Sequence, residues 1–140
     1  MIELRREVME RKLAFLRQFL TDLEPYTRLD AKGRGREHYA IERLLQLLCE
    51  SAADIGLQFL KARGYGLASS YREVFEALAQ LEVLPRDLAQ ELTDACAMRN
   101  LLTHLYDTID LTRVAAAIEP ALDLYRRYFR WALAEIDKLG

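Results

Sequence analysis

Apolar residues recur every three or four positions over long stretches of this chain, and that spacing constrains the fold more than any other feature. One stripe lies within residues 3–23 and comprises Met9, Leu13, Leu16, Leu20 and Leu23. A second lies within residues 36–62 and comprises Ile41, Leu44, Leu45, Leu48, Ala52, Ile55 and Phe59. Both patterns predict a helix with one apolar face. No segment alternates with period two for long enough to predict a strand.

Capping signals divide the rest of the chain into further helices. Ser70 and Glu73 match a capping box, in which each side chain accepts from a free amide at the helix start, and predict a short helix to about Leu81. Pro85 suits the first turn of a fourth helix that runs to about Thr103. Pro25 and residues 30–35 predict a connector between the first two helices.

The C-terminal part predicts either two helices or one kinked helix. Asp110 is a suitable N-cap, and Pro120 interrupts the helical pattern that follows. We expect a short helix to Ile118 and a longer one beyond it. The 140 residues suit a single domain. The sequence therefore predicts an all-α fold, an antiparallel bundle of four to five helices spanning residues 1–140.

Charge and cysteine content limit the classes of function. The formal net charge is −2, so the chain lacks the basic excess typical of proteins that bind nucleic acid through many phosphate contacts. Any role on RNA must rest on a local site. Cys49 and Cys96 lie in apolar helical stretches and are interpreted as buried, reduced thiols, which indicates a reducing compartment. The charged N-terminus and the lack of a long apolar run predict a cytoplasmic protein without a membrane segment.

Two histidines are the candidates for proton transfer near neutral pH. His38, at the start of the second helix, is interpreted as a surface or capping residue. His104 follows Arg99 by five positions, and Tyr106 follows His104 by two. Arg99 lies near the apolar line of its helix, so its charged guanidinium requires an anion, a carboxylate partner or a hydrated pocket at a subunit interface. Spacing alone also allows a purely structural set that caps the helix end.

Other polar and aromatic residues favour structural roles. The aromatic residues Tyr125, Tyr128, Phe129 and Trp131 stand near three arginines and could stack on nucleic acid, but their helical spacing is more typical of core or interface. On the second helix, Glu42, Gln46 and Asp54 are expected to face solvent or to pair with arginines.

The segment Arg99-Asn-Leu-Leu-Thr-His-Leu-Tyr106 resembles the R-x4-H-x-Y motif of the HepT toxins of HepT–MntA toxin–antitoxin systems, which belong to the HEPN superfamily. Further segments occur in the order expected for that family: Tyr39-Ala-Ile-Glu-Arg43, Leu45-Gln46, Asp54-Ile-Gly56, Ser70-Tyr-Arg-Glu73-Val-Phe75 and Met98-Arg99-Asn100. The likeness covers most of the chain.

This resemblance implies a homodimer, or a higher homo-oligomer, whose motifs meet across a two-fold interface to form a metal-independent endoribonuclease site. Arg99, Asn100 and His104 would be its catalytic residues. No cofactor is implied, and the sequence has no cysteine–histidine cluster or repeated carboxylate spacing suited to a metal. Tyr106 would be the site where an MntA-like nucleotidyltransferase attaches AMP and neutralises the toxin.

Two further readings stay open at this point. The chain could be a non-catalytic helical dimer that binds a nucleotidyltransferase and is modified by it. It could also be an oligomerisation domain whose polar residues only fix an interface. The acidic isoelectric point, about 5.8, favours the first of these two, whereas the complete Arg–Asn–His–Tyr set favours the ribonuclease.

Overall fold

The computed structural model describes residues 5–104 and 111–138, with side chains for residues 5–97 and 111–138. Its helices are α1 (Arg6–Leu23), a 3-10 helix (Glu24–Arg28), α2 (Ala31–Arg36), α3 (His38–Ala62), α4 (Tyr71–Gln80), α5 (Arg86–His104), α6 (Leu111–Ala116) and α7 (Ile118–Asp137). No strand occurs in the described part of the chain. The predicted all-α class is confirmed.

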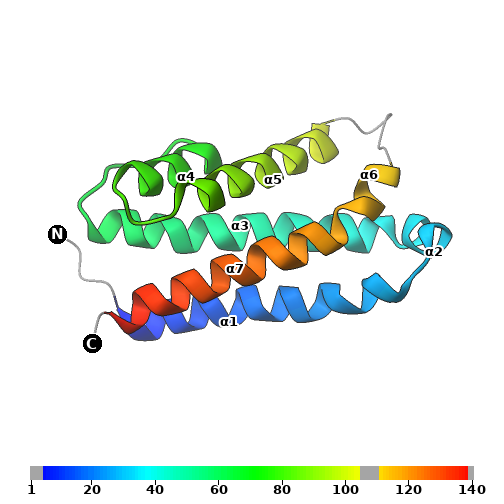
Figure 1. The fold of residues 1–140 in the computed structure, drawn as a ribbon, viewed down its shortest axis with the longest axis horizontal. Coiled ribbons are helices and arrows are strands. Elements are labelled where there is room, and N and C mark those ends of the chain that lie inside the picture. The colour runs from blue at the N-terminus through cyan, green and yellow to red at the C-terminus, as the bar shows by residue number, and fades with distance from the viewer. Residues whose placement is uncertain (1–4, 105–110, 139–140) are drawn as a thin grey trace.

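The long helices run side by side along one axis (Figure 1). Helix α3 packs against α1, α4, α5 and α7 and is the centre of the bundle. Helices α3 and α5 run in opposite directions, so the C-terminal end of α5 and the N-terminal end of α3 lie at the same end of the molecule, together with α2 and α6 (Figure 1). This is the end that carries the candidate motif.

Both predicted apolar stripes form the core. All five members of the first stripe are buried on α1, and all members of the second except Leu44 are buried on α3. Leu44 is partly buried against the same core. Burial of this continuous apolar surface is the main favourable term in folding, since about 25 cal/mol is gained per Å² removed from water.

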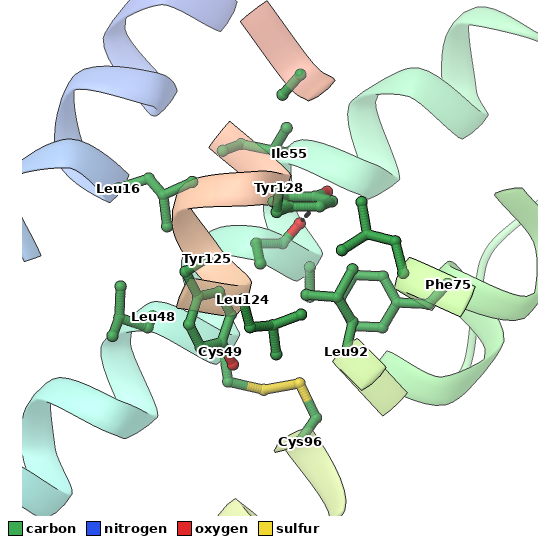
Figure 2. Packing of buried hydrophobic residues seen from close by; sticks show 14 of the residues in the cluster. Leu16, Leu48, Cys49, Ile55, Phe75, Leu92, Cys96, Leu124, Tyr125 and Tyr128 are labelled. Carbon is green, nitrogen blue, oxygen red and sulfur yellow. Dashed lines mark hydrogen bonds between the residues drawn. A yellow bond between two sulfur atoms is a disulfide. The ribbon is translucent and has the colours of Figure 1, made fainter. Parts of the chain in front are cut away.

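The aromatic residues of α7 belong to this core. Tyr125 and Tyr128 are buried, and Tyr128 Oη donates a hydrogen bond to the Ala52 carbonyl on α3 at 2.7 Å (Figure 2). Burial raises the pKa of the Tyr128 phenol, so this hydroxyl stays protonated. Trp131 is partly buried and donates from Nε1 to the Val83 carbonyl at 3.1 Å. The core interpretation is confirmed, and these rings are not a nucleic-acid stacking surface.

The close approach of α3, α4 and α7 requires a glycine. A Cβ atom added to Gly56 would lie 2.8 Å from Val74 Cγ1 and 3.2 Å from Tyr128 Oη. Such contacts are too short for a side chain, so Gly56 allows α4 and Tyr128 to pack directly on the α3 backbone.

The predicted connector at residues 25–35 is wrong in part, because most of it is helical. Pro25 lies in the first turn of the 3-10 helix, where its missing N–H costs nothing. Asp30 caps α2, its side chain accepting from the Gly33 amide at 2.8 Å. Pro25, Gly33 and Gly35 indicate a loop by composition, but local capping and tertiary contacts with α6 override that preference.

The other boundaries follow the sequence closely. Ser70 Oγ accepts from the Glu73 amide at 3.1 Å as predicted, whereas the Glu73 carboxylate accepts from the amide and hydroxyl of Ser69 and not from the Ser70 amide. The helix break expected near Pro120 lies at Ala117, and Pro120 stands in the first turn of α7. The predicted Asp110 cap lies outside the described residues.

The interpretation of the cysteines as reduced thiols is wrong. Cys49 on α3 and Cys96 on α5 form a disulfide, with their Cα atoms 5.7 Å apart (Figure 2). Both residues are buried, as expected, and the bond lies beside Leu124 and Tyr125 in the core. The cysteines therefore no longer indicate a reducing compartment. They do fix the register between α3 and α5.

Candidate functional site

Helix α5 carries most of the candidate motif. Leu88, Leu92 and Cys96 are buried along one side of this helix, and Arg99 comes one turn after Cys96. The helix ends at His104, one residue later than predicted, so positions 99, 100 and 104 all lie on it. Tyr106 lies outside the described residues. The roles of Arg99, Asn100, His104 and Tyr106 stay predictions at this point.

A histidine–carboxylate pair lies at the start of α3, at the same end of the bundle. His38 Nδ1 lies 3.0 Å from Glu42 Oε2, and the imidazole contacts the Tyr39 ring. The two side chains are only 18% and 15% exposed. His38 is therefore not the surface or capping residue expected from the sequence, and Glu42 pairs with a histidine rather than with an arginine or solvent.

The two other polar residues of α3 behave differently from Glu42. Asp54 accepts from Lys12 Nζ at 2.6 Å and so joins α3 to α1. Gln46 donates to Glu50 at 3.1 Å, one turn further along the same helix. Neither pairs with an arginine in these bonds, so that alternative is wrong, whereas the Asp54 side chain is 46% exposed, in line with the solvent-facing alternative.

Arg34 joins the segments around this end of the bundle. Its guanidinium donates to the carbonyls of Thr27, Leu29 and Ala115 at 2.7–3.0 Å and to both carboxylate oxygens of Glu119 at 2.7 Å. These bonds lower the pKa of the Glu119 carboxyl. Arg34 thus holds α6 and the start of α7 against α2.

Substitution of Arg34 with lysine is expected to lower the free energy of unfolding by about 2 kcal/mol, because an ammonium cannot reproduce a planar fork of five donors. Urea unfolding of the variant measures this loss, with Arg36→Lys on the exposed side of α2 as the matched control. Below the pH at which Glu119 protonates, the difference in the free energy of unfolding between parent and variant should shrink, because the carboxylate that Arg34 binds has lost its charge. Equal stability of parent and Arg34→Lys at neutral pH would contradict this role.

A surface pocket of about 460 Å³ lies between α3, α5, α6 and α7, next to the motif-bearing half of α5. Its walls are mostly apolar, formed by Leu45, Ala95, Ala116, Ala117, Pro120, Ala121, Leu124 and Tyr125, while Glu91, Asp94 and Arg113 supply charged groups. Because Glu91 is paired with Arg127, Asp94 and Arg113 are the remaining charged groups of the lining, and they leave no basic excess that would favour a phosphodiester. The pocket is therefore not suited to bind the RNA backbone.

Two of the three arginines of α7 are engaged in ion pairs. Arg127 donates to both carboxylate oxygens of Glu91 at 2.7 and 2.8 Å and to Asp123 at 3.0 Å, and these contacts lower the pKa of Glu91. Arg126 pairs with Glu24 at 2.6 Å. Both are committed to joining helices, which leaves them poorly placed to bind a nucleic acid.

Within the described side chains, no group of three or more histidine, cysteine, aspartate or glutamate residues is placed to hold a metal ion. Among the described helices, none combines the length and the apolarity that a bilayer crossing needs.

Comparison with known proteins matches this chain to a defined family. A family model described as "Ribonuclease HepT-like" matches residues 9–130. The tRNA nuclease HepT of Aphanizomenon flos-aquae is 33% identical over 126 residues, covering 88% of this chain and 86% of that protein. The mRNA nuclease HepT of Shewanella oneidensis is 26% identical over 91 residues, covering 65% and 68%.

Solved structures share the fold at lower identity. A cytosolic protein of unknown function from Bacillus subtilis, YutE, has a TM-score of 0.82 at 19% identity and covers 99% of this chain and 94% of its own. The tri-AMPylated Shewanella oneidensis HEPN toxin, solved in complex with an MNT antitoxin, has a TM-score of 0.77 at 20% identity, covering 91% and 97%. The helical order, the motif on α5 and the family match agree: this chain is a member of the HepT-like ribonuclease family.

Proposed function

We propose that this protein is the toxin of a toxin–antitoxin pair and acts as a metal-independent RNA endonuclease. The observation that carries the proposal is the R-x4-H-x-Y sequence, which begins in the last turns of α5 in a chain of the HepT-like family. The two HepT relatives described above are a tRNA nuclease and an mRNA nuclease. RNA is therefore the proposed substrate.

The proposed reaction uses the ribose 2′-hydroxyl of RNA as the nucleophile. His104 transfers a proton to or from the reacting oxygens, a role worth roughly 10²–10⁴-fold in rate. Arg99 stabilises the negative charge that develops on the phosphoryl oxygens, since its planar donors match two oxygens at once. Asn100 orients the phosphate or His104. The products are a 2′,3′-cyclic phosphate and a 5′-hydroxyl end.

Self-association completes the proposed site. One arginine and one histidine per chain become a larger catalytic set when two copies meet about a two-fold axis, because each surface then faces its own copy. The chain is accordingly proposed to act as a homodimer or a higher oligomer. The end of the bundle that carries α2, α6 and the last turns of α5 is the surface where the two motifs would approach each other.

The proposed location is the cytoplasm, where tRNA and mRNA are found. The Bacillus subtilis structural neighbour is described as cytosolic. The Cys49–Cys96 disulfide is unusual for that compartment. No cofactor is proposed.

Cleavage of RNA by the purified protein tests the proposal. The unmodified chain is incubated with total RNA in EDTA, beside Arg99→Ala and His104→Ala variants whose circular dichroism and oligomeric state match the parent. Cleavage by the parent alone is the expected result. No cleavage by a folded, unmodified oligomer would instead favour a non-catalytic dimer that binds and is modified by a nucleotidyltransferase.

The Tyr106→Phe protein is expected to keep its ribonuclease activity and to be no longer neutralised by the nucleotidyltransferase. The phenol oxygen is the proposed acceptor of AMP, and each added AMP places a phosphodiester charge and a base near the arginine that receives the substrate phosphate. Mass spectrometry after incubation with ATP and an MntA-like nucleotidyltransferase should show added AMP on the parent and none on Tyr106→Phe. Tyr39→Phe, which removes an exposed phenol on α3, is the matched control. AMP on the Tyr106→Phe protein would contradict the assignment.

A further inference from the structure

His38, the histidine outside the motif, lies on the side of α3 that faces α5. Cys49 faces α5, because its sulfur bonds Cys96. Glu42 and His38 precede Cys49 by 7 and 11 residues, close to two and three helical turns. At 100° per residue, both positions fall within about 20° of the direction of Cys49. His38 and Glu42 therefore share the face of α3 that the disulfide joins to α5.

The motif on α5 lies at about the same height along the bundle axis as His38 and Glu42 on α3. Each residue of a helix advances about 1.5 Å, so Glu42 stands about 10 Å and His38 about 16 Å from the disulfide along α3. In the opposite direction along α5, Arg99 stands about 4 Å and His104 about 12 Å from it. Because α3 and α5 are antiparallel, these distances run toward the same end of the molecule (Figure 1). Along the bundle axis, the position of His104 therefore falls between those of Glu42 and His38.

The hydrogen bond fixes which nitrogen of His38 is free. A carboxylate only accepts, so the imidazole donates from Nδ1 to Glu42 Oε2 at 3.0 Å, and the lone pair of the neutral ring is left on Nε2. A carboxylate that holds an imidazole in this way sets its tautomer and stabilises the imidazolium that forms when Nε2 takes a proton.

One oxygen of this pair has no donor. Glu42 Oε1 is buried and accepts no hydrogen bond from any described residue. A buried acceptor without a donor costs about 1–3 kcal/mol, and such groups are rare unless a ligand or partner completes the site. Glu42 Oε1 can therefore accept a further hydrogen bond from a water, a ligand or a neighbouring polar group.

We propose that His38, oriented by Glu42, is the general base of the ribonuclease site, and this inference rests on the function proposed above. His38 Nε2 removes the proton of the 2′-hydroxyl, the 2′-oxygen bonds to phosphorus, and the bond from phosphorus to the 5′-oxygen breaks. His104 gives its proton to the departing 5′-oxygen. Each histidine ends in the starting state of the other, and exchange of protons with water restores both. Glu42 is a positioning residue that acts through His38.

The proposed roles of the two histidines can be distinguished with a substrate that needs a general base but no general acid. An activated leaving group, such as 4-nitrophenol in uridine 3′-(4-nitrophenyl phosphate), departs without a proton and so needs no general acid, whereas it still needs the base. His38→Gln keeps a donor for Glu42 but cannot transfer protons. We expect His38→Gln to lose about 10²–10⁴-fold in kcat/KM on both RNA and the aryl ester. His104→Gln should lose as much on RNA and recover most of its rate on the ester.

Two further variants distinguish catalysis from structure. Glu42→Gln should lower kcat by about 10²-fold or more with little change in KM, because the tautomer of His38 is no longer fixed. Glu37→Gln, at an exposed neighbouring position, is the matched control and should cleave as the parent does. Added imidazoles should restore cleavage by His38→Gly, and more basic imidazoles should restore it further, which a purely structural role would not produce.

Three results would overturn the inference, and they point to different failures. If His38→Gln cleaves RNA at the parent rate while Arg99→Ala and His104→Ala do not, His38 is not the base and the proposed ribonuclease stands. If the His38→Gln defect disappears on the aryl ester, His38 acts as the acid. If the parent cleaves neither substrate, the proposed function fails, and the role of His38 with it.

Discussion

Replacement of Arg99 by lysine is expected to lower kcat for RNA cleavage by about 10²–10³-fold with a smaller change in KM. The loss follows from geometry, because a lysine keeps the charge but offers one compact ammonium in place of the planar fork that is proposed to contact two phosphoryl oxygens. Removal of a single donor to a developing oxyanion typically costs this much. A fixed RNA oligonucleotide under single-turnover conditions measures the chemical step directly.

The control for this prediction lies on the same helix. Arg86 stands exposed in the first turn of α5, at the opposite end from the motif, so Arg86→Lys makes the same chemical change away from the site. It should cleave as the parent does. An Arg99→Lys protein that keeps the parent kcat would show that Arg99 supplies only charge, and the proposed bidentate contact would then be wrong.

Reduction of the Cys49–Cys96 disulfide is expected to lower the free energy of unfolding by about 4 kcal/mol. The bond joins residues 47 positions apart, and the chain-entropy estimate for a loop of this size is about 4 kcal/mol. It also joins α3 to α5 one turn before Arg99. Urea unfolding with and without dithiothreitol, at one protein concentration, measures the difference.

A variant without the disulfide supplies the control. The Cys49→Ala/Cys96→Ala protein should unfold identically with and without the reductant, at a free energy below that of the oxidised parent. Both cysteines are buried, so part of its loss comes from the two small cavities that alanine leaves. If the parent showed the same free energy of unfolding in both conditions, the disulfide would not stabilise the fold.

Periodicity was sufficient to predict the helices, because their stability comes from apolar faces that the sequence displays directly. The stripe from Met9 to Leu23 is buried residue for residue, and the long helix through Phe59 ends at Ala62 as expected. The segment from Glu24 to Arg36 was missed, since prolines and glycines conceal short helices that depend on the Asp30 cap and on Arg34. Short elements of this kind are decided by tertiary contacts and not by propensity.

The polar contacts were harder to predict because they join distant segments. Nothing in the spacing of Cys49 and Cys96 pairs them, since that pairing depends on how α3 and α5 pack. The His38–Glu42 pair could have been found, because residues four apart share a helix face. That this pair lies at the same end of the bundle as the motif could not be predicted, because it depends on the register of α3 against α5. The motif at Arg99 and His104 was identified by resemblance to a family, and the family is confirmed.

Cleavage of two matched RNA oligonucleotides tests the ribonuclease mechanism most directly. One is all-ribose, and the other carries a single 2′-deoxy nucleotide at the bond that the protein cleaves. In EDTA, the parent should cleave the first to leave a 2′,3′-cyclic phosphate and should leave that bond of the second intact. The His104→Ala protein should cleave neither. Cleavage of the deoxy-substituted bond, or a 3′-hydroxyl product, would mean that water and not the 2′-hydroxyl attacks phosphorus, and would contradict the proposed mechanism.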